Sequence, residues 1–123
     1  MADHNRLGEK GETLAVELLK TKGYQIVGLN KRFGKAEIDI IAKIGDEIVF
    51  VEVKTRTSDY FGYPEESIDE KKIDLMGKAA EQFEKEYDEK CSIRFDCISV
   101  IVRKNETEIF HIEDAFLPGK DDF

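Results

Sequence analysis

The sequence predicts an α/β protein in which a mixed β-sheet is flanked by helices, with the element order αβββαββ. Two observations lead to this class. Helical periodicity of apolar residues occurs twice, over 8–22 and 68–87, and segments rich in Ile and Val lie between and after these stretches. A strand, a long helix and a further strand in succession indicate a crossover connection, which joins parallel strands in a sheet that otherwise contains hairpins.

The N-terminal third predicts one helix and one short strand. Small and apolar residues share one side of a helix over 8–22, and Gly23 is suited to end it. Residues 24–29 then predict a strand, and the basic segment 31–35, which contains Gly34, predicts a turn.

Two strand-like runs, 36–42 and 47–54, predict an antiparallel hairpin with its turn at 44–46. In the second run, Val residues alternate with Ile48 and Phe50, so both faces of this strand are apolar. We therefore expect it to be a central strand that is covered on both sides.

The remaining segments complete the order. Residues 55–67 contain Gly and Pro and predict a loop, and 68–87 predict the second long helix. Strands are expected over 94–102 and 107–112, with a turn at Asn105.

The 123 residues suit a single domain over 1–123. Its core is expected over about 8–116, followed by a flexible tail over 117–123. No apolar run approaches the length of about 18 residues that a membrane-spanning helix needs. Cys91 and Cys97 are too few for a disulfide framework, so we expect reduced thiols and a cytoplasmic protein.

The net charge of −8 argues against a nucleic-acid partner when it is taken as a whole. Acidic and basic residues balance over 1–60, however, and the acidic excess lies entirely in 61–123. The charge is therefore a caution about nucleic-acid binding and not an exclusion.

Charged residues interrupt the apolar pattern at four positions. Asp39 lies within the first strand of the hairpin, and Glu52 and Lys54 share one face of the second. If the strands pair, Asp39 and Glu52 project toward one point, where a divalent cation would remove their mutual repulsion. Glu12 lies at the border of the apolar side of the first helix, from which a long carboxylate can reach the sheet.

This pattern is typical of metal-assisted phosphodiester hydrolysis. Asp39 and Glu52 are the candidate ligands of Mg²⁺ or Mn²⁺, which would polarise a phosphoryl oxygen and activate water. Lys54 is the candidate catalytic ammonium, and Glu12 is a candidate accessory acid. The candidate nucleic-acid contacts are Arg32, Arg56 and Lys72.

Simpler interpretations remain open at this stage. Lys54 can form a buried ion pair with Glu52 or Asp39, and Glu12 can be a surface residue. Asp96 can pair with Arg94 or with a helix terminus.

Several strings of the sequence resemble the YraN-like family of uncharacterised bacterial proteins (UPF0102), and the likeness runs from about Gly8 to Phe116. The most specific string is Phe-Val-Glu-Val-Lys-Thr-Arg, which ends at Arg56. The strings are Gly11-Glu12, Asn30-x-Arg32, Glu37-Ile-Asp39-Ile-Ile-Ala42, Val49-Phe-Val-Glu-Val-Lys-Thr-Arg56, Phe61-Gly62, Arg94-Phe-Asp96 and His111-Ile-x-Asp-Ala-Phe116.

That family looks like a small member of the PD-(D/E)xK, restriction-endonuclease-like superfamily and is similar in layout to archaeal Holliday-junction resolvases. The resemblance implies Asp39 and Glu52 as metal ligands, Lys54 as the catalytic lysine and Glu12 as an accessory acid. It also implies a Mg²⁺-dependent nuclease that acts on DNA, branched DNA included. Cutting both strands of a duplex would need a homodimer. The alternatives are a nucleic-acid-binding or adaptor module that retains the site without turnover, and a structural protein with a buried ion-pair network.

Overall fold

A computed structural model describes residues 2–57, 70–87 and 90–115, and the side chains from residue 6 onward. The expected order αβββαββ is confirmed. The elements are α1 (Ala2–Thr21), β1 (Gln25–Phe33), β2 (Ala36–Ile44), β3 (Glu47–Thr57), α2 (Glu70–Glu86), β4 (Ser92–Val102) and β5 (Thr107–Ile112). Most of the loop expected over 55–67 and the tail expected over 117–123 lie outside the described residues.

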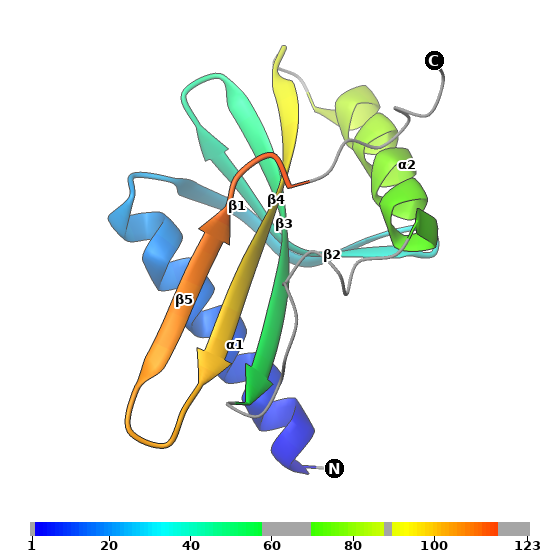
Figure 1. The fold of residues 1–123 in the computed structure, drawn as a ribbon. Coiled ribbons are helices and arrows are strands. Elements are labelled where there is room, and N and C mark those ends of the chain that lie inside the picture. Colours follow the sequence, from blue (N-terminus) through cyan, green and yellow to red (C-terminus); the bar gives the residue numbers. More distant parts are fainter. Residues whose placement is uncertain (1, 58–69, 88–89, 116–123) are drawn as a thin grey trace.

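The five strands form one mixed sheet in the order β1-β2-β3-β4-β5. The β3 and β4 strands are parallel, whereas every other neighbouring pair is antiparallel. The connection from β3 to β4 passes through α2, as the predicted crossover requires. Figure 1 shows α1 and α2 on different sides of the sheet, which is the layered arrangement expected of a restriction-endonuclease-like fold.

The β3 strand is central and covered on both faces, as predicted. Ile48 and Phe50 belong to a cluster with Met76, Ala79 and other residues on the side of α2, which we call the α2-face cluster. The residues on its other face pack in a second cluster on the side of α1, the α1-face cluster. Its fully buried members include Ala15, Leu19, Val49, Val51 and Ile98.

Two segments predicted as turn or loop are strand instead. Residues 31–33 are not a turn: they extend β1, because Lys31, Arg32 and Phe33 pair with the start of β2. The turn itself is confined to Gly34 and Lys35, where Gly34 has φ +62°. Residues 55–57 are likewise strand and not loop, since β3 continues to pair with β4 as far as Thr57. In both places the residue composition is typical of a turn or loop, but hydrogen bonds to a neighbouring strand make the segment part of the sheet.

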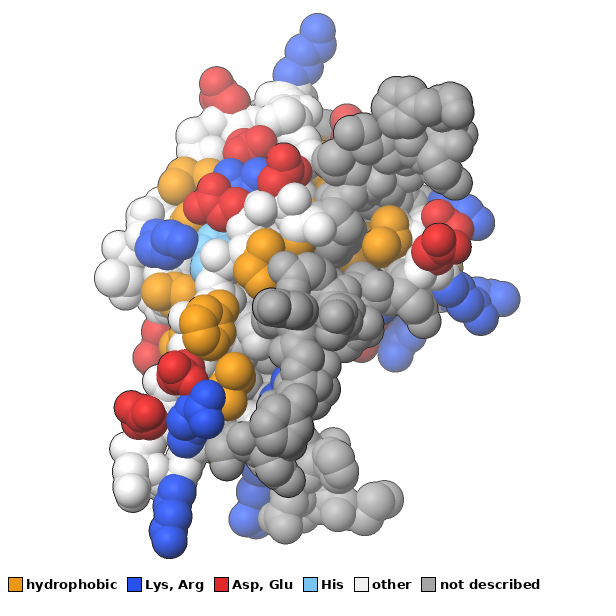
Figure 2. Space-filling model, viewed as in Figure 1, with side chains coloured by type: hydrophobic (Ala, Val, Ile, Leu, Met, Phe, Trp, Pro, Cys, Tyr) orange, Lys and Arg blue, Asp and Glu red, His pale blue; other side chains and the backbone are white. Residues whose placement is uncertain are grey.

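The N-terminal helix begins at Ala2 and not at Gly8. A glycine within a helix costs only about 1 kcal/mol, which the flanking turns can offset. None of the described helices has an apolar stretch long enough to cross a membrane. Acidic and basic side chains are interspersed over the face shown in Figure 2.

Candidate functional site

The antiparallel ladder between β2 and β3 stops where the two candidate carboxylates begin. Its last pair is Ile40 opposite Val51, so Asp39 and Glu52 are the next residues on the two strands. Instead of continuing the ladder, the Val53 backbone N–H donates to Asp39 Oδ2 at 2.9 Å. The two strands therefore separate at a point where one carboxylate replaces a backbone acceptor.

The course of β2 confirms that it is irregular at Asp39. Ile38 and Ile41 both belong to the α2-face cluster although they are three residues apart, whereas Ile40 belongs to the α1-face cluster. Strict alternation would place Ile38 with Ile40. The strand thus changes its orientation next to the carboxylate, which is a common device for directing a side chain into a site.

Glu52 is the most buried charged group here, with only 2% of its surface exposed. Its Oε2 atom lies 2.8 Å from Lys72 Nζ on α2 and 3.4 Å from Lys54 Nζ on its own strand. An ion pair of Lys54 with Glu52, one of the simpler interpretations of the sequence, is therefore present, and Lys72 makes the shorter contact. The buried Oε1 atom has no hydrogen-bond partner among the described residues. An orphaned carboxylate oxygen of this kind is uncommon and needs an explanation.

Asp39 is held in an environment that disfavours its charge. Burial, and then repulsion from the Glu52 carboxylate, raise the pKa of Asp39 to about 7. The Val53 N–H lowers this pKa, Glu12 raises it and Lys72 lowers it, each by a smaller effect. The charges of Glu52, Glu12 and Lys72 therefore all act on Asp39.

Lys72 remains a cation in this setting. Burial lowers the pKa of its ammonium, but the hydrogen bond and charge of Glu52, with the charges of Asp39 and Glu37, outweigh that effect and leave the pKa above its ordinary value. The sequence suggested Lys72 only as a contact for a phosphate backbone. Its salt bridge with Glu52 depends on how α2 docks against the sheet, which helical periodicity alone does not reveal.

Glu12 is positioned by the glycine before it. A Cβ atom on Gly11 would lie 2.9 Å from Thr55 Cβ and closer still to the Thr55 hydroxyl, so α1 and β3 touch at this point. Because Gly11 faces β3, the adjacent Glu12 lies at the edge of the contact, where Asn30 Nδ2 donates to its Oε1 at 3.2 Å. Gly11 thus brings the helix, and Glu12 with it, to the carboxylates.

Substituting Gly11 with alanine should push α1 away from β3. We expect Gly11→Ala to destabilise the protein by roughly 1–3 kcal/mol through overpacking. Gly8→Ala is the matched control, since a Cβ there meets nothing within 4 Å and alanine favours the helix. Urea denaturation of both variants checks this: equal effects of the two substitutions would contradict the close contact.

The remaining candidates are placed as follows. Arg56 lies two residues beyond Lys54 on β3 and is partly buried, and Arg32 is exposed on β1. Arg32 and Lys72 line one hollow of about 280 Å³ between the β1–β2 turn and α2. Arg32 therefore lies at the same hollow as Lys72, whose ammonium contacts Glu52.

The donors at this position are the carboxylate oxygens of Asp39 and Glu52, which are of the kind that Mg²⁺ accepts as ligands. No group of three or more His, Cys, Asp or Glu side chains suited to a metal occurs in the described part of the chain. Mg²⁺ keeps several of its waters in proteins and is commonly held by one or two carboxylates. The orphaned Glu52 Oε1 and the raised pKa of Asp39 both fit a cation at this position.

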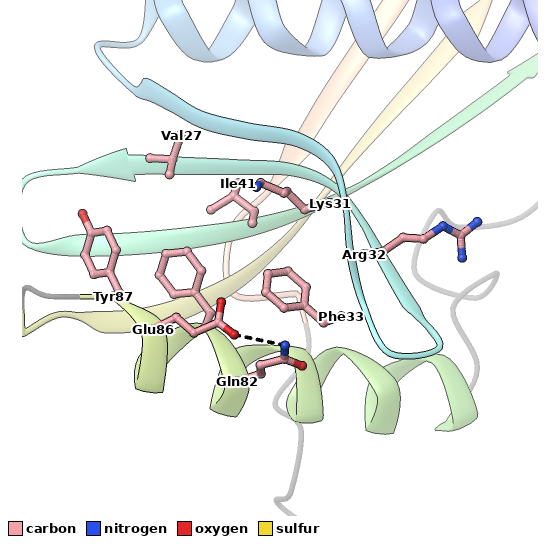
Figure 3. Close-up of a pocket in the computed structure, with 9 residues that line it drawn as sticks. Val27, Lys31, Arg32, Phe33, Ile41, Gln82, Glu86 and Tyr87 are labelled. Atoms are coloured by element: carbon pink, nitrogen blue, oxygen red, sulfur yellow. Dashed lines mark hydrogen bonds between the residues drawn. The ribbon is translucent and has the colours of Figure 1, made fainter.

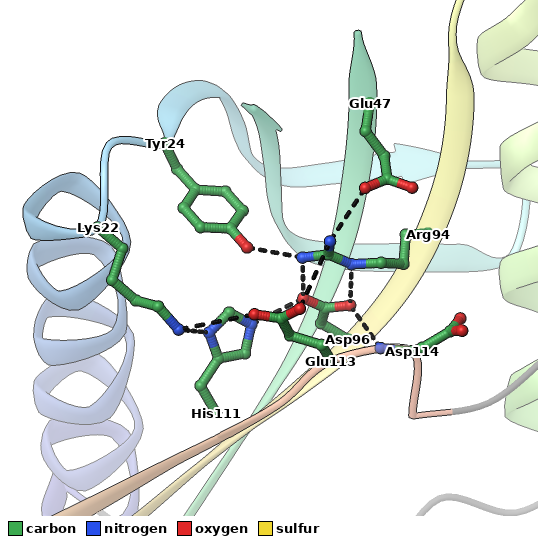
Figure 4. Close-up of polar contacts among 8 residues, drawn as sticks. All are labelled: Lys22, Tyr24, Glu47, Arg94, Asp96, His111, Glu113 and Asp114. Carbon is green, nitrogen blue, oxygen red and sulfur yellow. Dashed lines mark hydrogen bonds and ion pairs between the residues drawn. The ribbon is translucent and has the colours of Figure 1, made fainter. Parts of the chain in front are cut away.

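A second polar network lies on the α1 side of the sheet (Figure 4). Asp96, fully buried, accepts two hydrogen bonds from Arg94 at 2.8 and 2.9 Å, one from His111 Nε2 at 2.7 Å and one from the Asp114 N–H at 3.0 Å. The expected pairing of Asp96 with Arg94 is therefore found. Every lone pair of the Asp96 carboxylate is therefore occupied, which favours a structural role for Asp96. Glu52 differs, because its Oε1 atom has no partner among the described residues.

His111 also has a defined role in this network. Lys22 Nζ lies 2.6 Å from His111 Nδ1, and an ammonium can only donate. His111 Nδ1 must therefore accept, which assigns the proton to Nε2, the atom that faces Asp96. Tyr24 and Glu47 complete the surroundings of Arg94, with contacts of 2.6 and 3.0 Å. Sequence patterns gave no signal for these two partners, because they come from separate elements.

The family model described as "Uncharacterised protein family UPF0102" matches residues 11–100. The chain is 47% identical over 116 residues to a UPF0102 protein of Christiangramia forsetii, covering 94% of this chain and 98% of that one. It is 48% identical to a Flavobacterium psychrophilum relative, with the same coverage, and 43% identical over 118 residues to one from Bacteroides thetaiotaomicron, with 96% and 98% covered. Because the family model covers most of the chain and these relatives match nearly its whole length, the chain belongs to the UPF0102 family.

Proposed function

We propose that this protein is a Mg²⁺-dependent nuclease that hydrolyses phosphodiester bonds of DNA, with branched or structured DNA within its substrate range. The observation that carries the proposal is the state of Glu52. It is a carboxylate with 2% exposure whose Oε1 has no partner among the described residues, and it lies beside Asp39, whose pKa its charge helps to raise. Two such carboxylates are the ligands that a hard divalent cation requires.

The chain's own residues supply the rest of the chemistry. Lys54 and Lys72 hold Glu52 through Oε2, which leaves Oε1 available as a ligand. Asp39 is oriented by the Val53 N–H. When bound by Asp39 and Glu52, Mg²⁺ or Mn²⁺ would polarise the phosphoryl oxygen and activate water. The two ammonium groups would stabilise the negative charge that develops on the phosphate.

The second candidate function is a nucleic-acid-binding module without turnover. It is favoured by the same two lysines, since their contacts of 2.8 and 3.4 Å already neutralise Glu52. A site balanced in this way does not require a cation for stability. Metal-independent binding of DNA that survives loss of Glu52 would distinguish this module from the nuclease.

Cleavage of a labelled substrate panel tests the proposal. The panel contains single strand, duplex, flap and four-way junction, each incubated with Mg²⁺, Mn²⁺ or a chelator. We expect cutting only with a divalent cation, and Glu52→Gln should reduce the rate at least about 100-fold, because it removes a ligand that acts at the reacting phosphate. The preferred panel member would identify the substrate class.

Glu81→Gln is the matched control for this experiment, because it makes the same chemical change at an exposed position of α2. It should cut like the wild type. Folded wild-type protein that cuts no panel member with either metal would reject the nuclease. Cutting by Glu52→Gln at the wild-type rate would reject it as well, because it would point to a contaminating nuclease.

A further inference from the structure

Two hollows lie between α2 and the β1–β2 hairpin, and Arg32 lines both of them. The hollow of about 280 Å³ is lined by Lys72, which contacts Glu52, and by Lys35 and Arg32. Arg32 also lines a second cavity, of about 290 Å³, together with Lys31. Four cations in all line the two hollows: Lys72, Lys35, Arg32 and Lys31. Arg32 lines both, and its side chain points away from the second cavity (Figure 3). We call these four cations the cation track.

The cation track stands out against the acidic character of the whole chain. Among the described residues, two carboxylates, Glu37 and Glu86, line its hollows together with the four cations, one of which, Lys72, is paired with Glu52. The chain as a whole carries a net charge of −8. The other side of α2 has the opposite character, since the hollow there is lined by Asp74, Glu81 and Glu84 with Lys78. A polyanion would therefore be attracted to one side of α2 and repelled by the other.

The cavity at the far end of the track has an aromatic floor (Figure 3). Phe83 is 9% exposed and stacks on Tyr87 with a ring-centroid separation of 4.8 Å, and Phe33 meets Phe83 edge to face at 6.5 Å. Phe33 and Tyr87, which also line the cavity, are themselves partly exposed. These contacts fix the rings before any ligand arrives.

Polar groups at the mouth of the cavity suit the edge of a nucleobase. Gln82 Nε2 donates to Glu86 Oε2 at 3.2 Å, and both side chains are exposed. Together they offer an amide and a carboxylate, which can donate to and accept from a base edge. The Lys31 stem lies over Gly28, where an added Cβ would come within 3.1 Å of Lys31 Cγ. Gly28 thus leaves the space in which Lys31 extends along the cavity.

We propose that the cation track binds the phosphates of a single nucleic-acid strand and that the aromatic cavity receives one unstacked base of that strand. This inference rests on the proposed function and specifies its substrate: a single strand, or a base that has left its duplex. A base in a paired duplex is stacked on both faces and cannot enter a cavity between a helix and a sheet. Proteins that bind single strands commonly combine a positively charged groove for the backbone with aromatic side chains on which the bases stack.

Fluorescence anisotropy in EDTA tests the proposal without any need for cleavage. The probes are a labelled oligothymidylate, the same backbone with abasic sites, and a duplex of equal length. The wild type should bind the oligothymidylate more tightly than either other probe. Tyr87→Leu should weaken oligothymidylate binding roughly 5-fold or more while leaving abasic binding unchanged, since base stacking is lost. Tighter binding of the duplex, or an unchanged ratio in Tyr87→Leu, would overturn the proposal.

A second pair of variants leaves the aromatic rings of the cavity unchanged. Val27 and Leu29 are both exposed on β1, at 38% and 50%, but of these two only Val27 lines the aromatic cavity. Val27→Glu should weaken oligothymidylate binding about 10-fold by blocking the cavity with a carboxylate, whereas Leu29→Glu, with the same charge, should change it little. Equal effects would show that the cavity takes no base and that only overall charge matters.

The cations are tested by salt dependence. Arg32→Gln combined with Lys35→Gln should weaken binding of both single-stranded probes alike and reduce the slope of log affinity against log salt by about 0.7 for each lost phosphate contact. Lys78→Gln combined with Lys85→Gln removes the same charge from exposed positions elsewhere on α2 and should leave that slope unchanged. An identical slope for both double variants would show that the cations of the track do not contact the phosphates.

These results separate this inference from the nuclease itself. Strand binding that behaves as described, from a protein that cuts nothing, would retain the track and reject hydrolysis. Metal-dependent cutting that is insensitive to Arg32, Lys35 and Tyr87 would retain hydrolysis and reject the track.

Discussion

Replacing Asp96 with alanine is expected to lower the free energy of unfolding by about 3–5 kcal/mol. The carboxylate is fully buried, and Arg94, with its side chain 16% exposed, would lose its bidentate partner. His111 Nε2 and the Asp114 N–H would lose their acceptor as well. Removing one member of a buried charge network leaves the others desolvated without compensation. Asp96→Asn keeps the shape but turns an NH₂ group toward a donor, so we expect a smaller loss.

Urea denaturation between pH 3 and pH 7 measures this effect and its origin. Burial by itself would raise the pKa of Asp96, but hydrogen bonds from His111, Arg94 and the Asp114 N–H outweigh it, so the pKa lies below its ordinary value. The stability that this group contributes is therefore present above about pH 4 and is lost as the pH falls further. Asp96→Ala should lack this acid-dependent loss. A variant that loses less than about 1 kcal/mol at pH 7 would contradict a buried, satisfied network.

Asp39→Asn is expected to do the reverse and stabilise the metal-free protein at alkaline pH by roughly 2–4 kcal/mol. In the folded protein, burial and the charge of Glu52 raise the pKa of Asp39 from its ordinary range to about 7. The folded state therefore holds a proton that the unfolded state releases, and the wild type loses stability as the pH rises from about 4 through 7. Asparagine does not titrate and can still accept from the Val53 N–H.

Thermal unfolding in EDTA at pH 4.5 and pH 8.5 checks the sign of this effect. The gain from Asp39→Asn should be small at the lower pH and full at the higher one, while Asp74→Asn, at an exposed position of α2, should show neither. Mn²⁺ should stabilise the wild type at pH 8.5 but not Asp39→Asn. A destabilised Asp39→Asn variant at pH 8.5, or a gain that is independent of pH, would show that Glu52 does not act on Asp39 as described.

Much of the architecture follows from short-range patterns. The order αβββαββ, the central hairpin and the two apolar faces of β3 were all predictable, because helices and strands repeat apolar residues with different periods. The proximity of Asp39 and Glu52 was predictable from the hairpin, because residues at matching distances from its turn become neighbours, although the ladder itself ends one residue earlier.

The errors arose where a distant segment decided the outcome. The basic segment that resembles a turn became the end of β1 because β2 offered it partners. Lys72 became a partner of Glu52 because the crossover brings α2 onto that face of the sheet. Tyr24 and Glu47 joined Arg94 from two further elements.

By itself, then, the sequence determined the elements, their order and the carboxylates with their lysine, because strand and helix periods and hairpin pairing are local properties of the chain. Only the tertiary structure decided which second cation neutralises Glu52, how closely Gly11 brings Glu12 to the sheet, and where the cation track and its aromatic cavity lie. These features depend on the docking of helices against a sheet, which is set by contacts between residues far apart in sequence.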